Sequence, residues 1–160
     1  DILHYIDERN GNKFPREGED IEQDKWMKFS NDILGKSIVA VIYKNYRTSL
    51  HALDYVTKVD KFSLKDRIVS KWLGAIVMRM IGRSRAKMFE EPPRTNLQTQ
   101  LDSMSSGIEG EFFGGKGPNG ADFANYGILR SMQGLNGFDI VEKHSVIWPW
   151  YNRMQVLSNI

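Results

Sequence analysis

Residues 110–127 read GEFFGGKGPNGADFANYG, and the second half of this stretch has the pattern of a helix start. If Asn119 is the N-cap, its side chain can accept a hydrogen bond from an amide of the first turn, and Asp122 can accept one from the Asn119 amide in return. Pro118 and Phe123 then occupy the two positions of a hydrophobic staple. The pattern predicts a capping box and staple, with a structural role for Asp122.

The helix predicted after this start runs from Gly120 to about Leu135. It should be buried and central, because small and apolar residues recur on one of its faces. First-turn amides of a buried helix need partners within the protein, and Asp122 is placed to serve one of them. A carboxylate held in this way has its charge stabilised and is a poor proton shuttle. The predicted inward stripe is Ala121, Ala124, Ile128, Met132 and Leu135.

The glycine-rich residues before this helix match the phosphate-binding pattern G-x-x-x-x-G-K-[ST] at all but one position. A phosphate loop needs a buried strand before it and a Ser or Thr after the Lys. Here a helix-like segment precedes the loop, Gly117 replaces the hydroxyl residue, and Pro118 removes a backbone donor. The stretch therefore favours a tight turn over a nucleotide site.

Apolar spacing and capping signals predict five further helices. Along residues 19–43 the apolar positions recur at spacings of three to five, although 37–43 is also good strand sequence. Ser63 and Asp66 form a second capping-box pattern, and two prolines suit first helical turns. With no clear strand pair, the segments predict an all-α helical bundle. The predicted helices cover residues 19–43, 49–58, 63–87, 93–107, 120–135 and 149–157.

Length and composition suit one globular domain of 160 residues, 41% of them hydrophobic. The 22 Lys and Arg residues nearly balance the 20 Asp and Glu residues, so the charge points to no nucleic-acid partner. The absence of cysteine excludes disulfides, thiolate metal sites and a thiol nucleophile within these residues. The most apolar window, 68–81, is interrupted by Lys71 and Arg79, so we expect no membrane-spanning helix.

The other candidates for chemistry are isolated in the sequence. His4, His51 and His144 share no metal-ligand or base-nucleophile spacing, and we interpret them as surface or capping residues. The basic residues from Arg79 to Lys87 fall on one helix face, which we interpret as a solvated face in preference to a nucleic-acid stripe. The sequence therefore predicts no metal site and no catalytic residue in this chain.

Aromatic residues cluster along the first predicted helix and its exit, at Trp26, Phe29, Tyr43 and Tyr46. Aromatic stripes usually belong to a core, yet aromatic rings also wall apolar ligand clefts between bundle helices. The residues alone favour the core and leave the cleft wall as the alternative.

With its capped central helix, the chain resembles the C-terminal helical domain of the glutathione transferase superfamily, whose penultimate core helix begins with such a box and staple. Within the superfamily, residues 112–139, 148–153 (WPWYNR) and 46–48 (YRT) are similar to the type 2, membrane-associated prostaglandin E synthase family. The resemblance covers about residues 20–157. It implies a glutathione transferase C-terminal-like helical bundle.

Chains of that family begin with a thioredoxin-like domain that carries a Cys-x-x-Cys motif, the glutathione site and the residues credited with isomerising prostaglandin H2 to prostaglandin E2. The resemblance implies that residues 1–18 are a remnant of that domain with a linker, and that residues 19–160 are the helical domain. The chain starts at Asp1 without an initiating Met, so we expect it to be a piece of a longer protein. Glutathione would be bound mainly by the missing domain, in an intracellular protein that is cytoplasmic or peripherally membrane-associated.

The resemblance also implies that the helical domain forms the substrate-side wall of a cleft for a small apolar or electrophilic substrate, and that it helps to form a homodimer. The family links His and Ser side chains near the end of the first long helix to haem or substrate binding. Val39 and Ile42 stand at about those positions here, which argues against haem binding and prostaglandin synthesis. The candidate wall residues are Trp26, Phe29, Lys36, Val39 and Tyr43.

Two alternatives to a prostaglandin E synthase-like enzyme stay open. A glutathione transferase or thiol reductase acting on another electrophile would use the same cleft. A non-catalytic protein-interaction scaffold would use only the helical surface, because a fold does not fix a function.

Overall fold

The computed structural model describes residues 20–53 and 64–158, and every regular element within them is helical. This confirms the predicted all-α class. Apart from the helices, the described residues contain one isolated bridge, between Phe112 and Gly115. The elements are α2 (Ile21–Phe29), η1 (Ser30–Leu34), α3 (Gly35–Ile42), α4 (Tyr46–Ala52), α5 (Leu64–Ala86), α6 (Pro93–Ser105), α7 (Gly120–Arg130), α8 (Phe138–Lys143) and α9 (Ile147–Ser158).

The first three elements form one uninterrupted helical run, as the sequence predicted for this region. Asp20 caps its start, because the Asp20 side chain accepts from the Gln23 amide at 3.0 Å. The single π-helical turn η1 lies in the middle of the run, and α3 shows that the strand-like residues 37–42 are helical. Two of the regularly spaced apolar residues of this run lie at the surface, since Ile21 is 80% exposed and Ile33 is 39% exposed.

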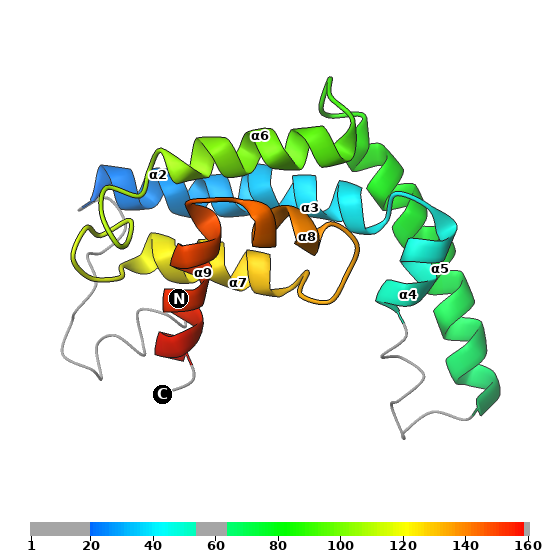
Figure 1. Ribbon diagram of the computed structural model, residues 1–160. Helices are drawn as coiled ribbons and strands as arrows, with labels where there is room; N and C mark the ends of the chain where they lie inside the picture. The colour runs from blue at the N-terminus through cyan, green and yellow to red at the C-terminus, as the bar shows by residue number, and fades with distance from the viewer. Residues whose placement is uncertain (1–19, 54–63, 159–160) are drawn as a thin grey trace.

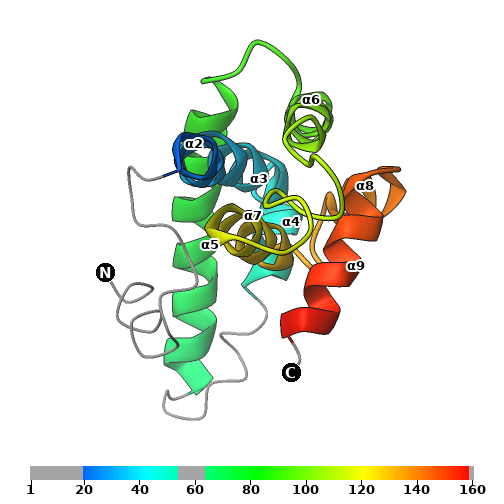
Figure 2. The same ribbon diagram turned by 90° about the vertical axis from the view of Figure 1, so that its left-hand side faces the viewer.

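The core lies where the first helical run packs against α6 and α7. Figures 1 and 2 show α6 and α7 running along opposite flanks of this run, with α8 and α9 closing one side and α5 crossing the end of α3. The side chains that fill the centre are fully enclosed. The largest of them are Leu34, Leu97, Leu101, Met104, Leu129, Met132, Ile147, Trp150, Tyr151 and Met154.

The central helix α7 is shorter than predicted, and its inward face differs. It ends at Arg130, and turns carry the chain through Gly134 and Gly137, whose φ angles of 76° and 96° are left-handed. The unpredicted short helix α8 follows. Of the predicted stripe, Ala121 and Met132 are fully buried, Ile128 and Leu135 are half-buried and pack against the core, and Ala124 is half-buried. The buried residues of α7 are Ala121, Asp122, Asn125, Tyr126 and Leu129.

Helix α4 begins three residues earlier than predicted because Asn45 caps it. The Asn45 side chain accepts from the Thr48 amide at 3.0 Å, and Thr48 completes a capping box. The helix ends at Ala52, and the rest of the predicted range, 54–58, lies outside the described residues. Helix α5 agrees with its prediction, although the proposed cap residue Ser63 also lies outside them.

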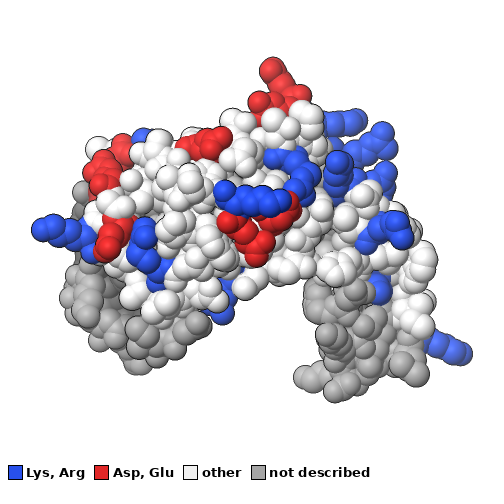
Figure 3. Space-filling view, viewed as in Figure 1, with Lys and Arg blue, Asp and Glu red and all other residues white. Residues whose placement is uncertain are grey.

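Basic residues are concentrated on α5. Residues 65–87 contain seven Lys and Arg and one Asp, in a chain whose net charge is only +2. Figure 3 shows the Lys and Arg side chains gathered around the part of the molecule where α5 lies. The near balance of charge in the whole sequence therefore conceals an uneven distribution in space.

Candidate functional site

Asp122 lies at the centre of a buried hydrogen-bond network. Its carboxylate is fully enclosed and accepts from the Asn119 amide at 2.9 Å, from the Phe113 amide at 3.1 Å and from the Trp150 indole N–H at 2.7 Å. The Asn119 side chain accepts from the amides of Ala121 and Asp122 at 3.0 and 3.3 Å. This arrangement ties the glycine-rich loop and α9 to the start of α7.

The two residues of the predicted hydrophobic staple differ in burial. Pro118 is half-buried, whereas Phe123 is 38% exposed. The network at Asp122 therefore rests on polar contacts. Since its three hydrogen bonds all come from within the protein, this carboxylate is engaged in structure and is not offered to a substrate.

The glycine-rich loop uses its amides internally. Those of Glu111 and Phe112 both donate to the Gly115 carbonyl at 3.2 Å, and the Gly115 amide donates to the Phe112 carbonyl at 3.0 Å. The Gly120 amide donates to the Gln23 side chain at 2.9 Å. With these amides and those held by Asp122 engaged, the loop does not offer the row of free N–H groups that a phosphate nest needs.

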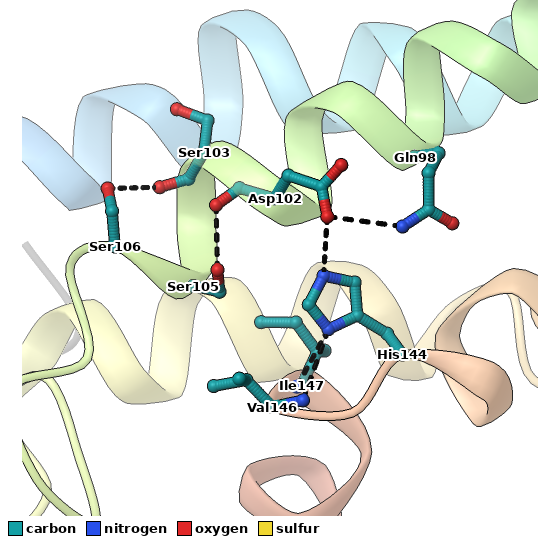
Figure 4. Close-up of polar contacts among 8 residues, drawn as sticks. All are labelled: Gln98, Asp102, Ser103, Ser105, Ser106, His144, Val146 and Ile147. Carbon is teal, nitrogen blue, oxygen red and sulfur yellow. Dashed lines mark hydrogen bonds and ion pairs between the residues drawn. The ribbon is translucent and has the colours of Figure 1, made fainter.

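His144 is a helix cap. It is 7% exposed, and its Nδ1 accepts from the amides of Val146 and Ile147 at 3.3 and 3.2 Å, at the start of α9 (Figure 4). Because Nδ1 accepts, the proton of the neutral ring lies on Nε2, which donates to Asp102 at 3.1 Å. Figure 4 also places Ser103, Ser105 and Ser106 in this region, but both ring nitrogens are engaged. The residue therefore lacks the free nitrogen that a general base needs.

A groove of about 700 Å³, a volume that suits a ligand of moderate size, lies on the surface of the described residues. It runs along the outer side of α2 and η1 and reaches Ser103 of α6. Its lining combines apolar and aromatic side chains with charged ones at the rim. The lining residues are Ile21, Asp24, Lys25, Trp26, Lys28, Phe29, Asp32, Ile33 and Ser103.

Trp26 forms the fixed part of this groove. The ring is 7% exposed and packs against Phe29 and Phe113, each with a centroid distance of 5.3 Å. Gly107 lies so close to the indole that any side chain there would collide with it. The Trp26 carbonyl also accepts from the buried Asn125 amide group at 3.1 Å. Trp26 therefore belongs both to the core, against which its ring packs, and to the lining of the groove.

The five predicted wall residues do not all reach the same groove. Trp26 and Phe29 line it, and Lys36 stands beside it through its ion pair with Asp32 at 3.6 Å. Val39 and Tyr43 lie further along the helical run, half-buried, and are not among the lining residues.

Most of the residues that line the groove were not predicted, because the wall residues were sought on the apolar face of the first helix. Charged residues such as Lys25, Lys28 and Asp32 share the outer face of the same helix. Their spacing of three to four is the signal that would have found them. Ser103 comes from another helix and has no such signal.

Neither a metal site nor a membrane span is found in the described residues. No cluster of three or more His, Cys, Asp or Glu side chains there is arranged to hold a metal ion. No helix in the same part of the chain is long and apolar enough to cross a bilayer.

The helical fold, with its capped central helix, fits the C-terminal domain of a glutathione transferase-like protein. The chain is homologous to prostaglandin E synthase 2. It is 33% identical to the Mus musculus protein of that name and 32% identical to the Danio rerio protein, over 139 residues in each case. The alignments cover 84% of this chain but 36% and 37% of those proteins, so the chain spans about a third of the length of these relatives. No family model matches the chain.

Proposed function

We propose that this chain is the helical part of a prostaglandin E synthase 2-like, glutathione-dependent isomerase or transferase. In this proposal, residues 19–160 supply the substrate-side wall of the cleft and a contact between two copies, and a thioredoxin-like domain outside the chain holds glutathione. The observation that carries the proposal is the groove along α2, which contains two of the predicted wall residues in a chain homologous to prostaglandin E synthase 2.

The groove suits the apolar part of a substrate. Trp26, Phe29 and Ile33 provide an apolar floor. Two charges at the rim are paired with neighbours outside the lining, Lys25 with Glu22 at 2.9 Å and Asp32 with Lys36 at 3.6 Å. A ligand with an apolar body and a polar end would bury the first and leave the second at the rim.

The lining residues do not fit haem. None of them is a His, Cys, Met or Tyr, the side chains that ligate haem iron. We therefore assign no haem ligand to the groove. Glutathione itself is assigned to the other domain, and the role of these residues is to bind and orient its apolar co-substrate.

A substitution that fills the groove tests this assignment. Ser103→Trp places an indole at the α6 side of the groove, and it should weaken the binding of a fluorescent long-chain fatty acid to the chain by at least about tenfold. Thr95→Trp is the matched control, since Thr95 is exposed on the same helix and does not line the groove. Equal binding by the two variants, or no binding by the unmodified chain, would contradict the groove assignment.

The scaffold alternative is favoured by a separate observation, an exposed apolar face on α5. The two functions are distinguished by assaying the proposed two-domain protein, in which a thioredoxin-like domain is joined to these residues. Glutathione-dependent turnover of prostaglandin H2 or of another electrophile supports the enzyme, and an inactive longer protein supports the scaffold.

A further inference from the structure

Cations are concentrated at the end of the molecule where α5 crosses the turn between α3 and α4 (Figures 1 and 3). Residues 33–53 and 67–89 contain no Asp or Glu, although the whole sequence has 20 of them. The nearest acids that follow along the chain are Glu90 and Glu91. The basic end, as we call it, consists of Lys44, Arg47, Arg79, Arg83, Arg85 and Lys87.

The basic end is assembled from two segments that are far apart in the sequence. The Arg79 guanidinium donates to the Lys44 carbonyl at 2.9 Å, which ties α5 to the turn after α3. A Cβ added at Gly82 would lie 2.7 Å from the Tyr43 Cβ atom, so α5 packs closely on the same turn. Arg47 follows in the first turn of α4. Tertiary packing therefore gathers these cations, which are spread over 44 positions of the chain.

The cations of the basic end have no acidic partner in the part of the chain that the structure describes. The ion pairs found there hold other basic residues, namely Lys25, Lys36, Arg94, Lys143 and His144. Beside the Arg79 bond, the basic end makes one further side-chain contact, from Arg85 to the Met88 sulfur at 3.5 Å. Like charges that lack counter-charges repel one another and oppose folding. Such a cluster is therefore suited to an anionic partner from outside.

The helix dipole accounts for only part of the basic end. Cations are favourable near the C-terminal end of a helix, where Arg83 and Arg85 occupy the last turn of α5. Arg47 lies in the first turn of α4, where the dipole disfavours a cation. The sequence favoured a solvated helix face because the charge of the whole chain is nearly balanced. That balance does not hold at this end of the molecule.

The spacing of the cations suits an anion that repeats along a chain. Arg79, Arg83 and Lys87 recur every four residues on α5 and the turn that ends it, at a rise of about 6 Å per step. The guanidinium group presents a fork of donors that matches phosphate oxygens. A nucleic-acid strand carries one phosphate per nucleotide and can engage several of these cations at once, whereas a small anion would engage only one or two.

We propose that the basic end binds the phosphate backbone of a single-stranded nucleic acid. This inference goes beyond the proposed function and is independent of it, because the basic end and the groove share no residue. Contacts with phosphates carry no sequence information, so strands of different base composition should bind alike. Each contact releases counterions, and with about four to six contacts the slope of log affinity against log salt should be about −3 to −4.

Fluorescence anisotropy of a labelled oligouridine of about 15 nucleotides, mixed with the 160-residue chain at increasing salt, tests the proposal. The oligouridine should bind at low salt with the stated slope, and an oligoadenylate of equal length should bind with similar affinity. Arg83→Gln with Lys87→Gln should weaken binding by at least about tenfold and make the slope shallower by about 1 to 2. Arg47→Gln should also weaken binding, because the basic end includes the first turn of α4.

Lys116→Gln with Lys143→Gln is the matched control. It removes the same charge from two exposed positions outside the basic end and should cause a much smaller loss of affinity. The substituted side chains of both double variants and of Arg47→Gln are exposed, so the helices should stay intact, which circular dichroism checks.

Four results would overturn the proposal. The first is a chain that binds neither oligonucleotide at low salt, and the second is binding that salt does not weaken. The third is an equal loss in the two double variants, which would assign binding to the charge of the whole chain. The fourth is a chain that binds vesicles of phosphatidylserine and phosphatidylcholine but neither oligonucleotide, because the basic end would then serve a lipid surface. A chain that fails with both oligonucleotides and still binds the fatty acid, with loss on Ser103→Trp, would leave the groove assignment standing.

Discussion

The buried carboxylate of Asp122 joins the glycine-rich loop, the start of α7 and helix α9. We expect its charge, as well as its shape, to contribute to the stability of the fold. In Asp122→Asn one oxygen becomes an N–H donor that faces another donor, so the variant should lose about 2 kcal/mol of unfolding free energy. Asp122→Ala leaves three donors without their partner and should lose more. Chemical unfolding followed by tryptophan fluorescence measures both, since Trp150 is one of the donors.

The control for this prediction is Glu142→Gln, an exposed carboxylate on α8 whose change should stay within about 0.5 kcal/mol. An Asp122→Asn change that leaves the stability unaltered but abolishes the activity of the proposed two-domain protein would contradict the structural role and would point to catalysis.

Sequence reading at the residue scale succeeded where the partners lie close together in the chain. Asn119 and Asp122 are three residues apart, and the capping box between them follows a local rule. The bonds from Trp150 to Asp122 and from Gly120 to Gln23 span 28 and 97 positions, and no local rule predicts them. His144 was interpreted as a surface or capping residue, but only the structure shows that it caps α9.

At the scale of elements, a partly exposed ion pair links α6 to α8. The Arg94 guanidinium donates to the Asp139 carboxylate and holds the pKa of Asp139 below its ordinary value of 3.8. A carboxyl whose pKa is lowered by folding adds stability above its unfolded-state pKa, and that stability disappears as the pH falls through the folded-state value. The link should therefore operate at neutral pH and be lost in acid below about pH 3.8.

Arg94→Met tests this link between the helices. At neutral pH the variant should lose about 0.5–1 kcal/mol of unfolding free energy, a small amount because the side chains are 41% and 43% exposed. Urea unfolding below pH 3.8 should show a smaller difference from the unmodified chain. Lys143→Met is the control on the same carboxylate, and its effect should be weaker because the 3.6 Å contact involves a side chain that is 78% exposed. A loss that is independent of pH would assign the effect of Arg94 to packing.

The limits of sequence reading at this scale concern where helices end. The long helices were predicted because their apolar positions recur over several turns. Helix α8 has six residues and follows Gly137, so its apolar pattern is too short to stand out. Gly137 is required there by its φ angle of 96° and by the close approach of Val41, which is a contact across the fold. The end of α7 was placed too late because the apolar residues continue into the turn.

For the whole molecule, the groove along α2 and the exposed apolar face of α5 are two separate surfaces. The two share no residue, since the groove lies along α2 and η1 and the face lies on α5. A substitution on the α5 face should therefore leave ligand binding in the groove unchanged. This independence follows from the helical scaffold, which places the two surfaces on separate helices.

The described residues offer no proton-transfer group in the groove apart from its rim charges, while Asp122 and His144 are fully engaged elsewhere. We therefore expect the purified 160-residue chain, given glutathione, to turn over neither prostaglandin H2 nor 1-chloro-2,4-dinitrobenzene, and the longer protein to turn over at least one of them. In the longer protein Ser103→Trp should lower kcat/KM at least about tenfold by blocking the apolar substrate, with Thr95→Trp near the unmodified rate. The affinity for glutathione should stay the same, since that site is assigned to the other domain. Turnover above background by the 160-residue chain would show that catalytic groups lie within it, and equal rates for the two variants would remove the groove from the active site.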